Sequence, residues 1–253
     1  MIAISLQSGS SGNCIYVETG GVRLLFDAGI CGSAAEGRLA AYGRDIRGVD
    51  AVIISHDHSD HARHAGVFQR KYGLPLFITE KTLAASEKRC RLGRLAEVRF
   101  FRTGDAVGFG PVTVRTVATP HDGEDGAVFI VESGGKRLGI MTDLGHVFGG
   151  LADEVAGLDA VFIESNYDPA MLKAGPYPAF LKRRIQGPSG HISNHESAEL
   201  LLAGGRLRWA CLSHLSGENN DPSVALRTHR EVLGGRIGLF TASRQAPTGI
   251  FRV

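Results

Sequence analysis

The sequence of 253 residues lacks long apolar runs and has few cysteines, and each of these absences excludes a class of protein. No apolar run approaches the roughly 20 residues of a membrane-spanning helix, and residues 1–6 lack the basic start and long apolar region of a signal peptide. The cysteines, at positions 14, 31, 90 and 211, form no CxxC pair. A disulfide framework or a zinc ribbon is therefore poorly supported, and we expect a cytoplasmic protein whose thiols are buried and reduced.

An excess of charge of one sign is also missing, since the formal net charge is only +2. This balance neither requires nor excludes a polyanionic partner. The basic residues are nevertheless uneven, because they outnumber Glu87 and Glu97 between Lys81 and Arg102, and residues 182–184 form a second basic cluster. Solvated helix faces are the default interpretation of such runs, and contact with a phosphate backbone is the alternative.

Apolar residues are plentiful at 43%, which suffices for a sizeable core in one α/β domain over residues 1–253. Short apolar runs predict strands over residues 3–6, 14–19, 22–26, 49–54, 75–78, 98–101, 106–109, 112–117, 128–132, 137–141, 160–163, 209–212 and 237–241. Helices are predicted over residues 33–42, 62–72, 80–89, 169–186 (interrupted at 175–178) and 221–233, and a further helix opens after Gly190.

The loop at residues 55–61 places three histidines within six residues, directly after the apolar run at residues 51–54. Imidazole and carboxylate side chains suit a divalent metal such as zinc, with manganese or iron as alternatives. The candidates are His56, His58, Asp60 and His61. Four ligands are too many for one catalytic ion that keeps a position open for water, so two ions are the natural interpretation. A solvated loop in which histidines cluster by chance is disfavoured, because only ten histidines are spread over the chain.

The motif His56-x-His58-x-Asp60-His61 resembles the signature of the metallo-β-lactamase superfamily. The resemblance implies a four-layer αββα sandwich with a dinuclear metal site at one edge. It also implies that distant strand ends complete the ligand set, with His56, His58 and His121 on one ion, Asp60, His61 and His214 on the other, and Asp143 bridging both.

Neighbouring residues receive supporting roles by the same resemblance. Asp27 is expected to support the histidine loop or to orient a ligand, whereas Asp57 and Ser59 are expected to be spacers. Two ions bridged by Asp143 would lower the pKa of a shared water toward neutrality and stabilise charge on a phosphoryl or acyl oxygen. Hydrolysis is therefore the expected reaction.

Three features favour a phosphodiester substrate over a thioester or a lactam. They are the Ser/Gly-rich segment at residues 8–13, the basic clusters and the element Gly190-His191-x-Ser193. This last element resembles the one in RNase Z-like enzymes, in which the histidine aids protonation of the leaving group. His191 is therefore the candidate general acid, and Asp60 is the other residue expected to take part in catalysis.

The combination of residues 8–13, Asp143 and the segment His214-Leu215-Ser216-x-Glu218-Asn219 closely resembles the YycJ (WalJ) family of metal-dependent DNA exonucleases. The resemblance implies a nuclease that acts on DNA ends with two divalent ions per chain, zinc or manganese first and iron as an alternative. No obligate protein partner and no membrane are inferred. A small-molecule hydrolase of the same fold is the alternative, and a binding protein with a dead site is disfavoured because none of the seven expected ligands is missing.

The remaining polar residues receive more general expectations. The substrate-binding candidates are Ser8, Ser10, Ser11, Asn13 and Asn219, although an ordinary Gly/Ser hairpin explains the first four equally well. Glu164 and Asn166 are expected beside the ligands or the substrate. Asp122, Glu124 and Asp125 are expected to be solvated, with hydrogen bonding to the ligands as the alternative. His64 and His229 are expected on helix surfaces and His195 in a structural role, while His146 is either pocket-lining or a helix-start residue.

Overall fold

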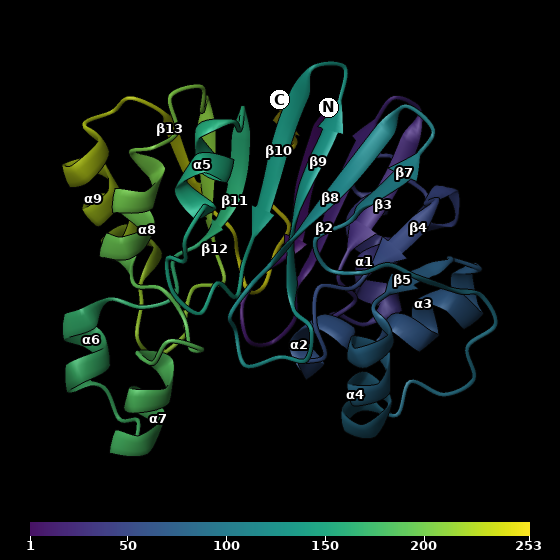
Figure 1. Cartoon of the computed structure of the whole chain (residues 1–253), viewed down its shortest axis with the longest axis horizontal. Coiled ribbons are helices and arrows are strands. Elements are labelled where there is room, and N and C mark those ends of the chain that lie inside the picture. Colours follow the sequence, from purple (N-terminus) through teal and green to yellow (C-terminus); the bar gives the residue numbers. More distant parts are fainter.

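In the computed structural model, which describes residues 1–253, two mixed β-sheets pack face to face and helices cover their outer faces (Figure 1). The first sheet has the order β14-β1-β2-β3-β4-β5-β6 and the second the order β13-β12-β11-β10-β9-β8-β7. This arrangement confirms the expected four-layer αββα sandwich.

The first sheet consists of β1 (Ile2–Gln7), β2 (Cys14–Thr19), β3 (Val22–Phe26), β4 (Ala51–Ile53), β5 (Leu76–Ile78), β6 (Val98–Phe100) and β14 (Phe251–Arg252). The second consists of β7 (Ala106–Phe109), β8 (Val112–Ala118), β9 (Ala127–Ser133), β10 (Lys136–Met141), β11 (Ala160–Glu164), β12 (Trp209–Ser213) and β13 (Gly238–Thr241). The helical elements are α1 (Gly32–Ala40), η1 (Ile46–Gly48), α2 (Ser59–Ala62), α3 (Ala65–Tyr72), α4 (Glu80–Cys90), α5 (Leu151–Ala156), α6 (Pro169–Ala174), α7 (Ala179–Ile185), α8 (Asn194–Leu201) and α9 (Pro222–Leu233).

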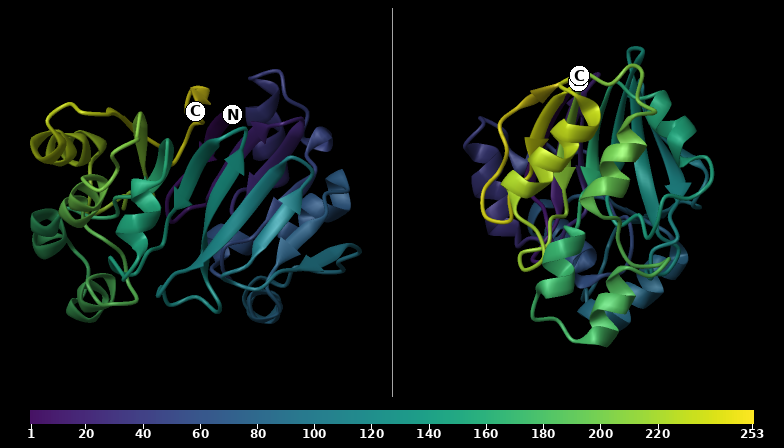
Figure 2. Two further views of the ribbon diagram at one scale, coloured as in Figure 1. Left: turned by 45° about the horizontal axis from the view of Figure 1, so that its top comes forward. Right: turned by 90° about the vertical axis from the view of Figure 1, so that its left-hand side faces the viewer.

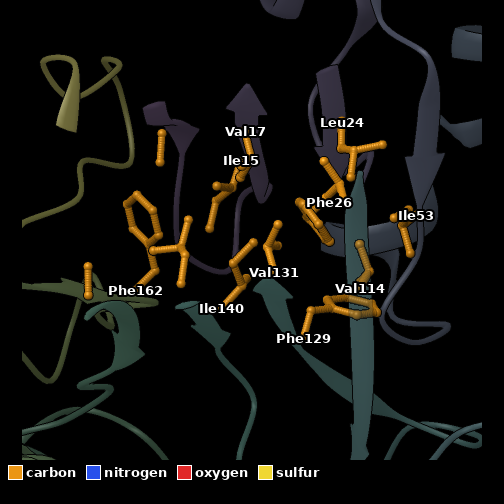
Figure 3. Close-up of a cluster of buried hydrophobic side chains, with 14 of the residues drawn as sticks. Ile15, Val17, Leu24, Phe26, Ile53, Val114, Phe129, Val131, Ile140 and Phe162 are labelled. Atoms are coloured by element: carbon orange, nitrogen blue, oxygen red, sulfur yellow. The ribbon is translucent and has the colours of Figure 1, made fainter. Parts of the chain in front are cut away.

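Central strands read as continuous apolar runs because both of their faces are buried. Along β3, Leu24 and Phe26 point into the core between the sheets, whereas Leu25 points to the helices outside. The inner layer is held by contacts across the two sheets, such as Phe26 of β3 against Phe129 of β9 with ring centroids 5.1 Å apart (Figure 3). Alternation along each strand therefore fixes which residues enter which layer.

Helical crossovers make part of each sheet parallel, and this decides where a site can form. The strands β3, β4, β5 and β6 run parallel to one another, and so do β10, β11, β12 and β13. Because the carboxyl ends of parallel strands meet at one edge of a sheet, the loops that follow them gather together. In Figure 1 this is the lower edge, where α2 lies between the two halves of the molecule.

Three elements were not predicted, and one predicted helix begins later than expected. The elements η1, α5 and β14 carry no strong local signal, and β14 is only a two-residue strand paired antiparallel with β1. The helix predicted over residues 62–72 begins later, as α3 at Ala65, and the short α2 precedes it, because His64 between them leaves helical geometry with φ −106° and ψ 7°. The cap at Thr79, whose hydroxyl accepts from Thr82 N, is present as expected. None of the helices is both long and apolar enough to span a membrane.

Two expectations about burial are wrong. Among the cysteines, Cys14 and Cys211 are buried, but Cys31 is exposed. His229 is fully buried rather than on a helix surface, because α9 packs against α8 along that face. Its ring lies between Ala225 O at 2.8 Å and Ser197 Oγ at 3.1 Å.

Because His229 is buried, the free energy of unfolding should depend on pH. Burial is the largest effect and lowers the pKa of His229 to about 4; the Ala225 carbonyl opposes this shift and His195 adds to it. The unfolded chain takes up this proton below about pH 6.5, whereas the folded chain resists until about pH 4. We therefore expect the free energy of unfolding to be highest above pH 6.5. It should fall by about 2 to 3 kcal/mol as the pH falls toward 4.

Urea unfolding at pH 7 and at pH 4.5 measures this contribution. His229→Gln should show a smaller loss of unfolding free energy between the two pH values than the unmodified chain. His146→Gln removes a histidine that does not act on His229; it is the control and should behave like the unmodified chain. If His229→Gln lost as much unfolding free energy between the two pH values as the unmodified chain does, the pH dependence would come from other groups.

Candidate metal centre

The expected ligands come from loops at the gathered strand ends. The loop after β4 carries residues 55–61, and single residues follow β8, β10 and β12, namely His121, Asp143 and His214. Two of these residues, together with Asp27, have left-handed backbone with φ of 65° at Asp27, 58° at Asp143 and 54° at His214. Positive φ is uncommon for residues other than glycine and often occurs at functional sites.

The first cluster consists of His56, His58 and His121, whose candidate ligand atoms all lie within 4.8 Å of one another. His58 Nδ1 is 3.2 Å from His121 Nε2. The other nitrogen of His121 donates to Gly190 O at 2.7 Å, which fixes the ring. These are the three residues expected on one ion.

The second cluster consists of Asp60, His61 and His214. Asp60 Oδ2 is 3.3 Å from His214 Nε2 and 3.6 Å from His61 Nε2. The carbonyl of Asp60 passes so close to Gly29 that a Cβ there would lie 1.7 Å from it, so only glycine fits at this position. The loop after β3 thereby supports the helix that carries this cluster.

Asp143 lies between the two clusters. Its Oδ1 is 3.6 Å from His121 Nε2 and 3.5 Å from His214 Nδ1. Asp143 also forms a possible ligand group with His56 and His61. A carboxylate in this position can contact both ions at once, which is what a bridging ligand requires.

The donor set fits divalent metal ions. His56 Nε2 is buried without a hydrogen-bond partner, and the buried Asp143 Oδ2 has only His61 Nε2 beside it, at 3.0 Å. Buried polar atoms left without a partner are unfavourable by about 1–3 kcal/mol each, so such atoms indicate a ligand. Imidazole nitrogens and carboxylate oxygens are the ligands of zinc and, where oxygen is richer, of manganese or iron.

The histidines of the two clusters differ in the direction in which their pKa values are shifted. Burial, reinforced by His61, holds the pKa of His56 well below its usual range. Burial also acts to lower the pKa of His61, but Asp27 and Asp143 outweigh it and hold that pKa well above the usual range. For His214 burial is again outweighed, chiefly by Asp143, and the pKa rises to about 10. Burial acts to raise the pKa of Asp143, yet His214 and His61 hold it well below the usual range.

Asp27 is buried beneath the histidine loop. Its Oδ1 accepts from Ser55 N at 2.8 Å, and its Oδ2 is 2.7 Å from His61 Nδ1. The carboxylate therefore fixes both the backbone of the loop and the orientation of one ring. This is the position that the expected supporting role requires.

Glu164 holds the candidate general acid. His191 Nδ1 lies 2.6 Å from Glu164 Oε1, while Glu164 Oε2 accepts from Leu144 N at 2.9 Å. Burial acts to raise the pKa of Glu164, but His191 outweighs it and the pKa falls to about 2. The same carboxylate is 3.7 Å from His214 Nδ1, so it contacts both rings. His191 itself is half-buried at the edge of the clusters.

The substrate-binding candidates divide into two groups. Ser10 and Ser11 are exposed. Ser8 and Asn13 are buried and support the clusters instead: Ser8 Oγ accepts from His214 N at 2.8 Å, and Asn13 Nδ2 is 2.9 Å from His61 Nε2. The sequence does not distinguish the exposed serines of this segment from its buried residues, which these contacts separate.

Asn219 does not face a substrate. Its side chain is fully buried, and a Cβ on Gly175 would lie 2.6 Å from Asn219 Oδ1. The site instead uses Asn166, whose Nδ2 donates to His214 O at 2.9 Å. Asn219 was placed at the substrate because it follows the His214 loop, and the close approach of α6 has no local sequence signal.

Two aspartates near the clusters do more than the sequence indicates. Asp57 is no spacer: it is fully buried, accepts from Glu124 N at 2.7 Å and pairs with Arg89 Nε at 2.5 Å. Asp122 is exposed, as expected, yet its Oδ2 pairs with Arg184 Nη2 at 2.7 Å. Its other oxygen lies 3.4 Å from His58 Nε2. Only their three-dimensional partners distinguish these two residues from solvated loop carboxylates.

His146 and His64 lie outside the clusters. His146 lines a cavity of about 430 Å³ between α5 and α8, and its Nδ1 donates to Pro188 O at 2.7 Å. Of its two proposed roles, the pocket-lining one is therefore observed. His64 is half-buried just before α3, and His195 is exposed on α8.

Residues 8–203 match the Metallo-beta-lactamase superfamily, and the fold and clustered ligands define a metal-dependent hydrolase of that class. A solved structure, the metallo-β-lactamase fold protein YhfI from Bacillus subtilis, superposes with a TM-score of 0.76 over 100% of both chains at 17% identity. Exodeoxyribonuclease WalJ of Streptococcus pneumoniae is 37% identical over 227 residues, which are 88% of this chain and 84% of that protein. Exodeoxyribonuclease YycJ of Bacillus anthracis is 35% identical over 90% of this chain and 87% of that protein. The chain belongs to the WalJ/YycJ family of this superfamily.

Proposed function

We propose that this protein is a metal-dependent exodeoxyribonuclease that hydrolyses phosphodiester bonds from the ends of DNA, in the 5′-to-3′ direction. The observation that carries the proposal is the similarity to WalJ and YycJ, which covers 88–90% of the chain. A cytoplasmic location is part of this proposal, because the proposed substrate is DNA.

The proposed ligands of two divalent ions, zinc or manganese first and iron as an alternative, are His56, His58 and His121 for one, Asp60, His61 and His214 for the other, and Asp143 for both. When bound, such ions activate a water for attack and stabilise negative charge on the phosphoryl oxygens. Asp60 takes part in catalysis by holding its ion beside the reacting phosphate. Asp27, Ser8 and Asn13 keep these side chains in position.

His191 is proposed to donate a proton to the departing oxygen. Because Nδ1 of the ring is engaged by Glu164, Nε2 is the atom left to act on the substrate. The hydrogen bond to Glu164 fixes the orientation of the ring. Breaking the phosphorus–oxygen bond then releases a neutral hydroxyl group rather than an alkoxide.

The exposed hydroxyls of Ser10 and Ser11 are proposed to contact the terminal 5′-phosphate. The turn that presents them depends on Gly9, whose φ of 128° is strained for other residues. Hydroxyls and successive backbone amides are good donors to a phosphate.

Incubation of the purified chain with Mn²⁺ or Zn²⁺ and end-labelled DNA tests the proposal. We expect progressive release of mononucleotides or short products from DNA, and none when the metal is chelated with EDTA. RNA, a thioester and a small cyclic phosphodiester are the comparison substrates. Cleavage of one of these while single- and double-stranded DNA stay intact would show that the nuclease assignment is wrong.

A further inference from the structure

A groove of about 410 Å³ lies along α4, the helix that packs against α2 at the edge of the metal clusters (Figure 1). Its lining residues are Lys81, Ala84, Ala85, Lys88, Arg89 and Glu124. The first five come from α4 at spacings of three and four residues, which places them on one side of the helix. The acidic residues of α4, Glu80 and Glu87, do not line the groove. The groove therefore carries three positive charges against one negative charge.

The two lysines of this groove have no partner in the chain. Lys81 and Lys88 are exposed, and their side chains make no hydrogen bond or ion pair. Lys71 on α3, by contrast, pairs with Glu36 at 2.9 Å. Seven residues separate Lys81 from Lys88, which corresponds to about 10 Å along the helix axis. Two unpaired positive charges thus lie along one face of α4.

Arg89 joins the groove to the first metal cluster. Its Nε pairs with Asp57 Oδ2 at 2.5 Å, and Asp57 stands between His56 and His58 in the chain. Asp57 is fully buried, whereas 51% of the Arg89 side chain is exposed. The buried carboxylate therefore fixes the orientation of a guanidinium group that lines the groove. The groove begins beside the histidines of the first cluster and leads away from them along α4.

We propose that this groove binds the phosphate backbone of the DNA substrate where the DNA leads away from the metal clusters. Arg89 binds the phosphate nearest the clusters, and Lys88 and Lys81 bind phosphates further along. The two lysines contact different phosphates, because their separation exceeds the roughly 3.4 Å axial spacing of phosphates in one strand. The inference rests on the proposed nuclease function and adds the surface that holds the uncleaved part of the substrate.

The lining of the groove determines what is recognised. No aromatic ring lines it, so it offers no surface on which an unpaired base would stack. Lysine and arginine contacts to phosphates position DNA without reading its sequence. The groove is therefore suited to DNA of any sequence and leaves base pairs intact.

Fluorescence anisotropy with a labelled DNA duplex tests the groove. Phosphorothioate linkages slow cleavage, so that binding to the metal-loaded chain is measured directly. Lys81→Gln and Lys88→Gln should each weaken binding by about 5- to 10-fold at roughly 0.1 M salt. Each should also reduce the slope of log affinity against log salt by about 0.9, the value for one lost phosphate contact on a duplex. Lys88→Arg should stay within about twofold of the unmodified chain, because it keeps the charge.

Arg230→Gln is the matched control. Arg230 is also an exposed cation on a helix without a side-chain hydrogen bond or ion pair. Its helix, α9, lies far from α4 in Figure 1 and in the left view of Figure 2. This variant should bind DNA as the unmodified chain does. Glu124→Gln removes the one negative charge of the groove and should strengthen binding by about 1.5- to 5-fold, the size of one exposed charge interaction.

Two further measurements separate the groove from the metal clusters. The lysine variants should keep the metal content of the unmodified chain, because neither lysine contacts a proposed ligand. They should also hydrolyse thymidine 5′-p-nitrophenyl phosphate normally, since this small phosphodiester does not extend along α4.

Two results would overturn the groove as a DNA-binding surface. One is unchanged affinity and salt slope in both lysine variants, and the other is an equal loss of affinity in Arg230→Gln. Cleavage of end-labelled DNA is read separately. A chain that degrades DNA while its lysine variants bind normally refutes the groove alone, whereas a chain that cleaves no DNA refutes the nuclease function on which the groove rests.

Discussion

Replacing Asp143 with asparagine should reduce DNA hydrolysis by about a thousandfold or more. The carboxylate lies between the two histidine clusters, and its loss would remove the negative charge of the proposed bridging ligand. Metal ions contribute several kcal/mol to the stabilisation of the transition state, and each 1.4 kcal/mol corresponds to a tenfold change in rate. The substitution keeps the shape of the side chain, so the fold should persist.

Metal content by elemental analysis accompanies the rate measurement. Asp143→Asn should lower the retention of both ions, whereas His214→Ala should lower the metal count by about one ion per chain. Asp159→Asn is the matched control, because Asp159 is also a buried carboxylate but accepts from Arg137 N outside the site. Its metal count and activity should match those of the unmodified chain. An unchanged metal count in His214→Ala would remove His214 from the ligand set.

Replacing His191 with alanine should reduce the turnover of DNA by about 100- to 10,000-fold, the usual contribution of a general acid. The metal count should stay the same, since His121 and His214 do not depend on the His191 ring for their own hydrogen bonds. A substrate with a p-nitrophenyl leaving group needs no proton on its departing oxygen. The variant should therefore lose far less activity on thymidine 5′-p-nitrophenyl phosphate than on DNA.

If His191 only supported the structure, its replacement would lower activity on both substrates equally. A larger loss on DNA than on the p-nitrophenyl substrate therefore indicates proton donation. His195→Ala, one helical turn further along and exposed, is the matched control and should leave both activities unchanged. Glu164→Gln should lower DNA turnover in the same selective way, because a neutral amide holds Nδ1 of the ring less strongly than the carboxylate does. Equal losses on the two substrates would refute proton donation by His191.

The sequence predicts the strands well because their apolar runs are buried on both faces, as along β3. It also predicts where Asp143 and His214 lie, because each directly follows such a run. The sequence does not predict the partners of Asp57, since Arg89 lies 32 residues away and no local pattern links the two. A carboxylate in a polar loop gives the same sequence signal whether it is solvated or buried.

His229 shows an available signal that was overlooked. The buried face of α9 includes Ala225, His229 and Leu233, which are spaced four residues apart. This spacing places the three side chains on one side of a helix. Helical periodicity thus predicts burial even for a polar residue, provided that a partner such as Ser197 is present. The presence of that partner on α8 follows only from the structure.

The left-handed backbone at Asp27, Asp143 and His214 implies a conflict between thermal stability and activity. Each such conformation is unfavourable for a residue with a Cβ, by about 1–3 kcal/mol, and glycine would adopt it freely. Selection for heat resistance alone would therefore favour glycine at the positions where the reaction needs a carboxylate or an imidazole. Mutants that survive heating but have lost hydrolysis should be enriched at these three positions, because stability and activity then favour different residues there.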